Sequence, residues 1–253
     1  MKLGAQLYSL RQFTQTYEDL DTTFAKIKQI GYDVVQVSGI GPISAEQLAE
    51  LSKKHALPVT CTHSPMDRIL TDTDALIAEH KIYGCDEIGL GGMGYDNYST
   101  LEKAREMIEK FREPVKRIMD AGMTFAYHNH SKEFLDIGGT CFYDLLIEEF
   151  PEINFILDTY WVVYAGRDPV DYIKRISGKR IKNIHFKDME TEGQGRICAC
   201  GNGIIDFKPI YDTCINEGIP YAQVEEDNAQ EAYGDAFEQM AISYKNLKPL
   251  FTK

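Results

Sequence analysis

Short apolar runs and longer segments of helical periodicity follow one another along the whole chain. The apolar runs predict strands at residues 3–8, 33–37, 58–61, 87–90, 124–127, 154–157, 181–184 and 221–224. Apolar residues at helical spacing predict helices at residues 18–30, 44–55, 72–83, 99–121, 140–150, 169–176, 206–217 and 232–247. The pattern therefore indicates eight strand–helix units.

Local signals support several of these boundaries. Gly31 follows the first predicted helix and is a typical terminating residue. Ser44 is followed three residues later by Gln47, which is the spacing of a capping box at a helix start. Pro114 lies inside the predicted helix 99–121 and allows a bend there.

The alternation of strands and helices predicts a parallel sheet with helical crossovers. Eight such units in 253 residues are the usual size of a closed (β/α)8 TIM barrel, an α/β fold. A doubly wound open sheet is the alternative, but it normally has a glycine-rich phosphate loop after its first strand, and residues 7–11 contain no glycine. No linker or low-complexity segment divides the chain, so we expect residues 1–253 to form a single domain.

Composition excludes some classes of partner. The chain has 27 Lys and Arg against 39 Asp and Glu, a formal net charge of −12, which disfavours nucleic acid because phosphate binding needs a clustered basic surface. No stretch approaches the roughly 20 apolar residues of a membrane span, and the N-terminus lacks the pattern of a signal peptide. We expect a cytoplasmic protein that binds neither nucleic acid nor membrane.

Cysteine usage is ordinary for a reducing compartment. The six cysteines are scattered, and only Cys198 and Cys200 are close in sequence. One C-x-C pair without a second pair nearby is weak support for zinc or redox chemistry, so we expect no role for these thiols in the mechanism.

Polar residues follow the predicted strands at the ends that lead into the helices. The densest group is Tyr-His-Asn-His-Ser-Lys-Glu-Phe at residues 127–134, directly after the fifth strand. In a TIM barrel these strand ends meet at one face, where catalytic groups are found. Glu133, Asp158, His185 and Glu225 follow successive strands and suit a divalent ion such as Mn²⁺, Mg²⁺ or Co²⁺ better than a structural zinc.

Six stretches of the sequence resemble the xylose-isomerase-like TIM barrels of the AP endonuclease 2 superfamily, often described as sugar phosphate isomerases/epimerases. They lie at residues 4–11, 127–134, 157–166, 184–189, 201–207 and 224–227, so the resemblance extends over nearly the whole chain. It implies metal ligands at Asp158, His185 and Glu225. The epimerases of this superfamily place a glutamate at the end of strand five, where this chain has His128. The fourth ligand is then Glu133 or His128, and we expect Glu133.

The resemblance implies a carbohydrate substrate and a divalent metal cofactor (Mn²⁺, Mg²⁺, Co²⁺ or Zn²⁺). We expect an isomerase or epimerase that abstracts a proton next to a carbonyl through a metal-stabilised enediolate, with Glu225, His128 or His130 moving the proton. The alternative is a lyase or dehydratase acting on a keto-sugar, 3-keto-glycoside or inosose, which the His-Asn-His stretch favours. A sugar-binding protein without activity is a third possibility.

Other strand-end residues are candidates for contact with the substrate. Lys187 is expected to polarise a substrate oxygen, unless it is a solvated lysine, and Trp161 to form an apolar wall for a sugar ring. Gln6 and His63 are expected to line the pocket. Gly201 and Gly203 precede a predicted helix and allow a phosphate site, although a simple loop is favoured. Aromatic residues near this face allow a homodimer that completes the pocket.

Overall fold

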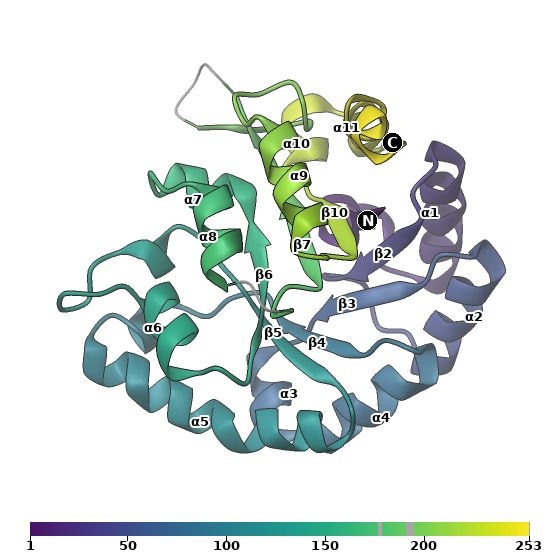
Figure 1. The fold of residues 1–253 in the computed structure, drawn as a ribbon. Coiled ribbons are helices and arrows are strands. Elements are labelled where there is room, and N and C mark those ends of the chain that lie inside the picture. The colour runs from purple at the N-terminus through teal and green to yellow at the C-terminus, as the bar shows by residue number, and fades with distance from the viewer. Residues whose placement is uncertain (177–178, 191–194, 253) are drawn as a thin grey trace.

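Eight parallel strands close into a barrel in the computed structural model, which describes residues 1–176, 179–190 and 195–252 (Figure 1). Their order around the barrel is β1-β10-β7-β6-β5-β4-β3-β2. The strands are β1 (Lys2–Gln6), β2 (Val34–Val37), β3 (Val59–His63), β4 (Glu87–Leu90), β5 (Thr124–His128), β6 (Asn154–Asp158), β7 (Asn183–Phe186) and β10 (Tyr221–Val224). Two short strands, β8 (Asp188–Met189) and β9 (Ile197–Cys198), pair antiparallel outside this sheet.

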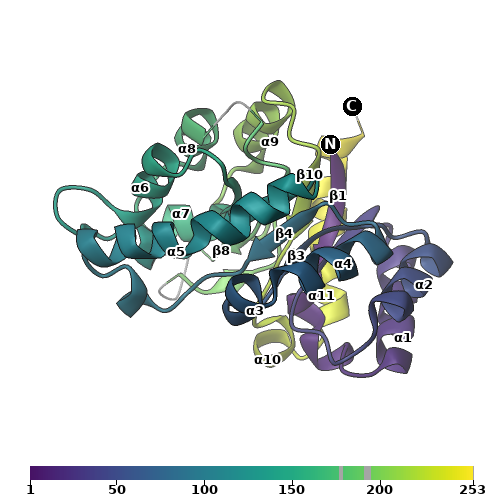
Figure 2. The ribbon, with the colours of Figure 1, turned by 90° about the horizontal axis from the view of Figure 1, so that it is seen from below.

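Helices surround the barrel. They are α1 (Tyr17–Ile30), α2 (Ala45–His55), α3 (Met66–Thr71), α4 (Thr73–Tyr83), α5 (Leu101–Asp120), α6 (Phe142–Glu149), α7 (Thr159–Tyr164), α8 (Pro169–Ile176), α9 (Phe207–Asn216), α10 (Ala229–Tyr233) and α11 (Ala236–Phe251). Short 3-10 turns lie at Leu7–Phe13, Tyr95–Asn97 and Lys132–Phe134. Seen from below, α1, α2 and α4 lie together on one side, and α6 and α8 lie on the other (Figure 2).

The predicted TIM barrel is confirmed, and several boundaries differ from the predicted ones. Ser44 and Gln47 form the predicted capping box at the start of α2. The predicted helix 232–247 is instead two helices, because Gly234 adopts a left-handed φ of +80° and Asp235 caps the start of α11. Strands β3 and β5 extend further than predicted, to His63 and His128, so two histidines are themselves strand residues.

Side chains inside the barrel form layers because residues two apart on a strand point to the same side. Ala126, Cys61 and Ile156 form an apolar layer. On the same strands, the residues two positions further on are His128, His63 and Asp158. The polar strand-end layer is therefore stacked directly on an apolar floor, which separates the candidate site from the other end of the barrel.

A polar network lies on the other side of that floor. The buried Glu87 carboxylate accepts hydrogen bonds from Asn183 Nδ2 at 2.7 Å, Asn154 Nδ2 at 2.9 Å and Thr124 Oγ1 at 3.2 Å. Burial raises the pKa of Glu87, and the hydrogen bonds from the two asparagines oppose that shift. The network joins strands β4, β5, β6 and β7 through side chains as well as through the backbone ladder.

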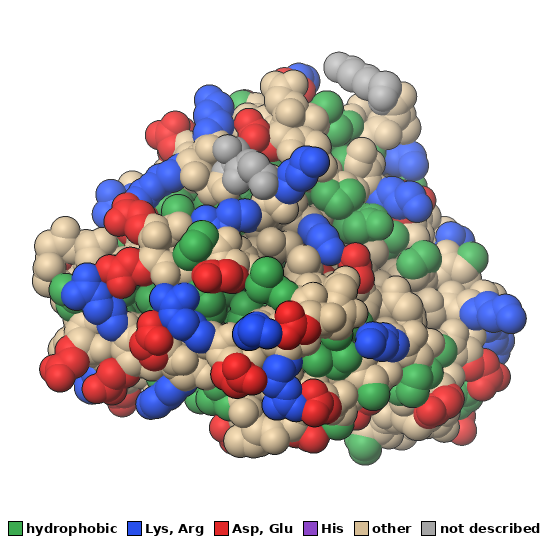
Figure 3. Space-filling model, turned by 60° about the horizontal axis from the view of Figure 1, so that its bottom comes forward, with side chains coloured by type: hydrophobic (Ala, Val, Ile, Leu, Met, Phe, Trp, Pro, Cys, Tyr) green, Lys and Arg blue, Asp and Glu red, His purple; other side chains and the backbone are tan. Residues whose placement is uncertain are grey.

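The outer surface mixes both signs of charge. On the face shown in Figure 3, Asp and Glu side chains are interspersed with Lys and Arg side chains. Ion pairs such as Arg105–Glu149 at 2.7 Å link neighbouring helices. Among the described residues, none of the helices combines the length and the apolar character that a membrane span needs.

Candidate active site

Four buried side chains converge at the strand ends. His128 ends β5, Asp158 ends β6, His185 lies near the end of β7, and Glu225 directly follows β10. Each offers one ligand atom, and these atoms all lie within 4.8 Å of one another. Alternation along each strand explains the convergence, because all four residues belong to the inward-facing set. Two imidazole nitrogens and two carboxylate oxygens form a donor set suited to a borderline divalent cation.

The two imidazoles are held in fixed orientations by groups on neighbouring strands. His185 Nε2 donates to Gln36 Oε1 on β2 at 2.7 Å, which directs Nδ1 toward Glu225 Oε2 at 2.9 Å. His128 Nδ1 donates to the Gly91 carbonyl at 3.2 Å, which directs Nε2 toward Asp158 Oδ2 at 3.3 Å. Such outer partners fix the tautomer of a ligating histidine. Gln36 was not among the residues expected at the site, although alternation along β2 is the signal that places it on the inward side.

Charges in the site shift the pKa values of its members. Burial alone would raise the pKa of Asp158, but the Lys187 ammonium and the nearby imidazoles outweigh burial and lower it. Burial opposes protonation of His185, yet Glu225 and Asp158 raise the pKa of this histidine to about 9. Burial lowers the pKa of His128 to about 4, even though Asp158 opposes the shift. Asp158 is therefore ionised at neutral pH.

Lys187 is buried in the site. Its ammonium lies 2.7 Å from Asp227 Oδ2, 3.3 Å from Glu225 Oε2 and 3.7 Å from Asp158 Oδ2. The ammonium also lies 5.2 Å from the centroid of the Trp161 ring. The side chain is 1% exposed, so the interpretation of Lys187 as a solvated lysine is wrong.

The structure does not bring Glu133 into the cluster. Glu133 lies in the turn Lys132–Phe134, where its carboxylate accepts from the Tyr127 hydroxyl at 2.9 Å and from the His130 backbone N–H at 3.0 Å. Tyr127 precedes the inward-facing His128, so its side chain points away from the barrel interior and Glu133 follows it. The fourth member of the cluster is therefore His128, which was the alternative to Glu133.

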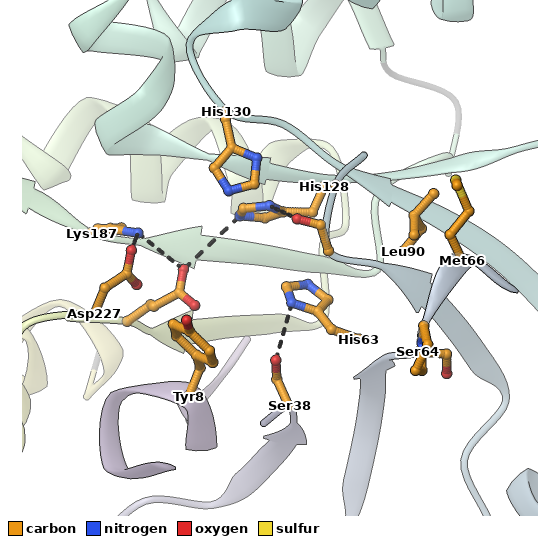
Figure 4. Close-up of a pocket in the computed structure, with 14 residues that line it drawn as sticks. Tyr8, Ser38, His63, Ser64, Met66, Leu90, His128, His130, Lys187 and Asp227 are labelled. Atoms are coloured by element: carbon orange, nitrogen blue, oxygen red, sulfur yellow. Dashed lines mark hydrogen bonds and ion pairs between the residues drawn. The ribbon is translucent and has the colours of Figure 1, made fainter. Parts of the chain in front are cut away.

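A cavity of about 390 Å³ opens beside the cluster and has the size of a small-molecule site. Five of the residues expected at the site line it: His63, His128, His130, Lys187 and Glu225. Figure 4 shows Lys187 and Asp227 on one side of the cavity and His63 with Ser38 on another. Gly91 and Gly92 also line it, and a Cβ on either would come within 2.8 Å of the His63 or the His130 ring.

Gln6 and Trp161, which were expected to contact substrate, are not among the residues that line this cavity. Gln6 is buried, and its Oε1 accepts from the Tyr8 backbone N–H at 3.2 Å. The Trp161 ring lies 5.3 Å from the His130 ring, and its backbone N–H donates to Asp158 Oδ1 at 3.1 Å. Trp161 therefore packs near His130 outside the cavity lining, and the Asp158 carboxylate caps the start of α7 by accepting from the Trp161 backbone N–H.

The loop with Gly201 and Gly203 is organised by Asp188. The Asp188 carboxylate accepts from the backbone N–H groups of Met189, Gly201, Gly203 and Ile205 at 2.8 to 3.1 Å. At the start of α9, where a phosphate was considered, Asp206 Oδ1 already accepts from the Lys208 backbone N–H at 3.0 Å, so the interpretation as a simple loop fits better. The six cysteines are buried free thiols.

Comparison with known proteins agrees with this architecture. Inosose dehydratase from Lacticaseibacillus casei is 25% identical over 147 residues, which cover 52% of this chain and 49% of that protein. The chain thus spans about half the length of the curated relatives it matches. A sugar phosphate isomerase/epimerase from Parabacteroides distasonis has a TM-score of 0.81 at 23% identity, with 98% of both chains covered.

A solved structure of the IOLI protein with a bound zinc atom has a TM-score of 0.71 at 15% identity, covering 99% of this chain and 98% of that one. These solved structures share the fold. The sequence profile of the xylose isomerase-like TIM barrel family matches residues 24–241, which is most of the chain. The chain has eight parallel strands closed into a barrel and matches this family profile, so it belongs to the xylose isomerase-like TIM barrel family.

Proposed function

We propose that His128, Asp158, His185 and Glu225 hold one divalent metal ion. The donor set of two imidazoles and two carboxylates suits Mn²⁺, Co²⁺ or Zn²⁺ better than Mg²⁺, which prefers oxygen ligands. Charge supports the assignment, since the carboxylates of Asp158, Glu225 and Asp227 face the single ammonium of Lys187. In the metal-free protein the protonated His185, with a pKa of about 9, offsets one further negative charge. A divalent cation would displace that proton and would then balance the two carboxylate charges left in excess. A bound cation supplies a Lewis acid for a carbonyl oxygen of the substrate.

We further propose that the protein is a lyase. It removes a proton from the carbon next to a carbonyl and expels an oxygen substituent from the following carbon, as water or an alcohol. The substrate class is a keto-sugar, a keto-glycoside or an inosose. The observation that supports this best is His128, which occupies the strand-five position where the epimerases have a second glutamate. Its two nitrogens face the Gly91 carbonyl and Asp158 Oδ2.

Epimerisation requires proton-transfer groups on both faces of the reacting carbon. In the described cluster, Glu225 is the carboxylate that lines the cavity, and its pKa is held low because Lys187 and His185 outweigh the effect of burial. The position of the ionised Glu225 carboxylate in the cavity lining supports it as the group that takes a proton from one face. Lys187, fixed by Asp227 at 2.7 Å, is placed to donate a hydrogen bond to an oxygen of the substrate. The glycines at 91 and 92 keep the opposite wall open.

An isomerase or epimerase, which we expected from the sequence, is the second candidate. A single carboxylate can return the abstracted proton to the neighbouring carbon on the same face, so Glu225 alone satisfies that reaction. The fold-level likeness to a sugar phosphate isomerase/epimerase is compatible with it. The imidazole at strand five removes the second carboxylate that epimerisation uses, which counts against an epimerase but not against an isomerase. The lyase is placed first because the curated relative that the chain matches is an inosose dehydratase.

The experiment is a reaction screen in deuterated water with the metal-loaded protein. Ketoses, 3-keto-glycosides and inososes would be followed by NMR, with a metal-free sample as the control. The lyase predicts an unsaturated product together with one equivalent of released water or alcohol, only in the presence of metal. Deuterium at carbon without loss of a group would show an isomerase or epimerase instead. No exchange with any substrate class would favour a binding protein.

A further inference from the structure

A second cavity adjoins the active-site cavity. It has a volume of about 630 Å³ and lies between the loop that precedes α2 and helices α3 and α4. Ser38, His63, Ser64 and Pro65 line both cavities. The side chains of His63 and Ser64 therefore form a wall shared by the active-site cavity and the second cavity, which we call the groove.

Ser64 presents a hydrogen-bond acceptor at that wall. His80 Nδ1 lies 2.7 Å from the Leu76 carbonyl, which can only accept, so Nδ1 carries the proton. Burial lowers the pKa of His80 to about 4, so Nε2 is unprotonated and accepts from the Thr62 hydroxyl at 2.9 Å. Thr62 has then used its hydrogen, and the Ser64 hydroxyl must donate to Thr62 Oγ1 at 3.0 Å. The Ser64 oxygen keeps its lone pairs for a ligand hydroxyl.

His63 presents a second polar atom at the wall. Its Nδ1 lies 3.4 Å from Ser38 Oγ, whereas its buried Nε2 has no hydrogen-bond partner among the described residues. A buried polar atom without a partner costs free energy, which a hydrogen bond to a ligand atom would recover. His63 lines both cavities, so a ligand that spans them passes beside its ring.

Among the described residues that line it, the groove offers a ligand no free cation, and its one carboxylate outside the Arg68 ion pairs is the exposed Glu46. Arg68, the cationic residue that lines it, is bound to the Glu79 carboxylate by two hydrogen bonds of 2.9 Å and to Asp72 Oδ2 at 3.0 Å. Ile43, Leu48 and Tyr83 supply apolar surface. Apolar surface with a few oriented hydroxyl groups matches a sugar ring or another neutral polyol, and a phosphate would lack an available cation.

We propose that this groove is a second subsite, which binds the neutral, hydroxyl-bearing leaving half of a two-part substrate. The keto half lies at the proposed metal site, and the oxygen that joins the two halves lies beside His63. In the elimination, a C–H bond next to the carbonyl and the C–O bond to the bridge break while a C=C bond forms. The proton removed balances the proton gained by the leaving oxygen, so the products are an unsaturated ketone and an alcohol. This inference rests on the proposed lyase for its reaction and on the groove for its binding.

The test measures binding of two unreactive probes to the Mn²⁺-loaded protein by calorimetry. Methyl β-glucopyranoside has a methyl leaving half, and methyl β-cellobioside has a second hydroxylated ring there. We expect the cellobioside to bind at least tenfold more tightly. Ile43→Trp fills the groove and should bring the two Kd values together, and Ser64→Ala should reduce their ratio several-fold. Ile215→Trp, on the exposed face of α9, is the matched control and should keep the wild-type ratio.

Equal Kd values for the two probes in the wild-type protein would overturn the subsite. So would an Ile43→Trp protein that is folded by circular dichroism and keeps the wild-type ratio. Turnover of the corresponding 3-keto compounds separates this inference from the proposed function. A binding preference without elimination refutes the lyase and retains the subsite, whereas elimination without a preference refutes the subsite and retains the lyase.

Discussion

Gln36 shows how one residue outside the donor set controls its geometry. Its Oε1 accepts from His185 Nε2 at 2.7 Å, and this bond leaves His185 Nδ1 facing the carboxylates. A leucine at this position would remove the acceptor and free the imidazole to rotate.

We predict that Gln36→Leu lowers the affinity for Mn²⁺ or Zn²⁺ by about 10- to 100-fold, the usual cost of losing such a partner. Calorimetric titration of the metal-free protein measures it. Gln36→Glu keeps an acceptor at the same distance and should restore most of the affinity. If the leucine variant binds metal as tightly as the wild type, Gln36 does not orient the ligand.

Glu133 and His128 can be told apart as ligands by metal content. We predict that His128→Ala loses bound metal, because it deletes a donor within 4.8 Å of the other three. Glu133→Gln should keep one equivalent, because this carboxylate bonds Tyr127 and the His130 N–H instead. Elemental analysis after dialysis gives the stoichiometry. Metal loss in Glu133→Gln alone would restore Glu133 as the ligand.

At the scale of elements, the loop between β9 and α9 depends on a single carboxylate. Asp188 accepts the backbone N–H groups of Gly201, Gly203 and Ile205, which lie in that loop. These bonds replace the regular backbone pairing that a helix or strand would provide.

We predict that Asp188→Ala lowers the free energy of unfolding by about 2–4 kcal/mol, since hydrogen bonds to a charged group are worth more than neutral ones. Amide hydrogen exchange at these three residues should accelerate. The control is Asp206→Ala in the same loop, which removes only the N-cap of α9 and should cost about 1 kcal/mol. Equal costs for the two variants would contradict the role given to Asp188.

The strand and helix pattern was predictable from the sequence because each element buries a face with its own period. The split at Gly234 was missed, although a glycine followed by the N-cap residue Asp235 is a local signal for the end of one helix and the start of the next. The site was predictable as a set of strand-end residues. We predicted Glu133 as a ligand from its residue type. Whether a residue in this stretch faces the barrel interior depends on where β5 ends, and the sequence did not give that boundary. Alternation places Gln36 inside the barrel, but its contact with His185 on β7, which is not a neighbour of β2, required the three-dimensional structure.

For the whole molecule, acid stability should depend on buried histidines. Burial lowers the pKa of His80 to about 4, against an ordinary value of 6.5 in an unfolded chain. Above the ordinary pKa of 6.5, His80 is neutral in both the folded and the unfolded protein, so its shifted pKa does not change the free energy of unfolding. As the pH falls toward 4, the unfolded state takes up the proton first and the folded state loses stability.

We predict that between about pH 7.5 and about pH 5 the metal-free wild type loses roughly 2 kcal/mol more stability than His80→Asn. Asparagine retains a donor for the Leu76 carbonyl and does not titrate. Urea unfolding at the two pH values gives both differences. Identical pH dependence in the two proteins would show that His80 is not held neutral by the fold.

The network around Glu87 bears on how the barrel can be assembled from pieces. Its carboxylate comes from β4, whereas the amide donors Asn154 and Asn183 come from β6 and β7. If the chain were cut in the turn before β5, one fragment would contain the carboxylate and the other all of its side-chain donors. Each half-barrel would then hold polar groups that its own core cannot satisfy. The two fragments should be unfolded apart and recover structure only on mixing, as a complementing pair.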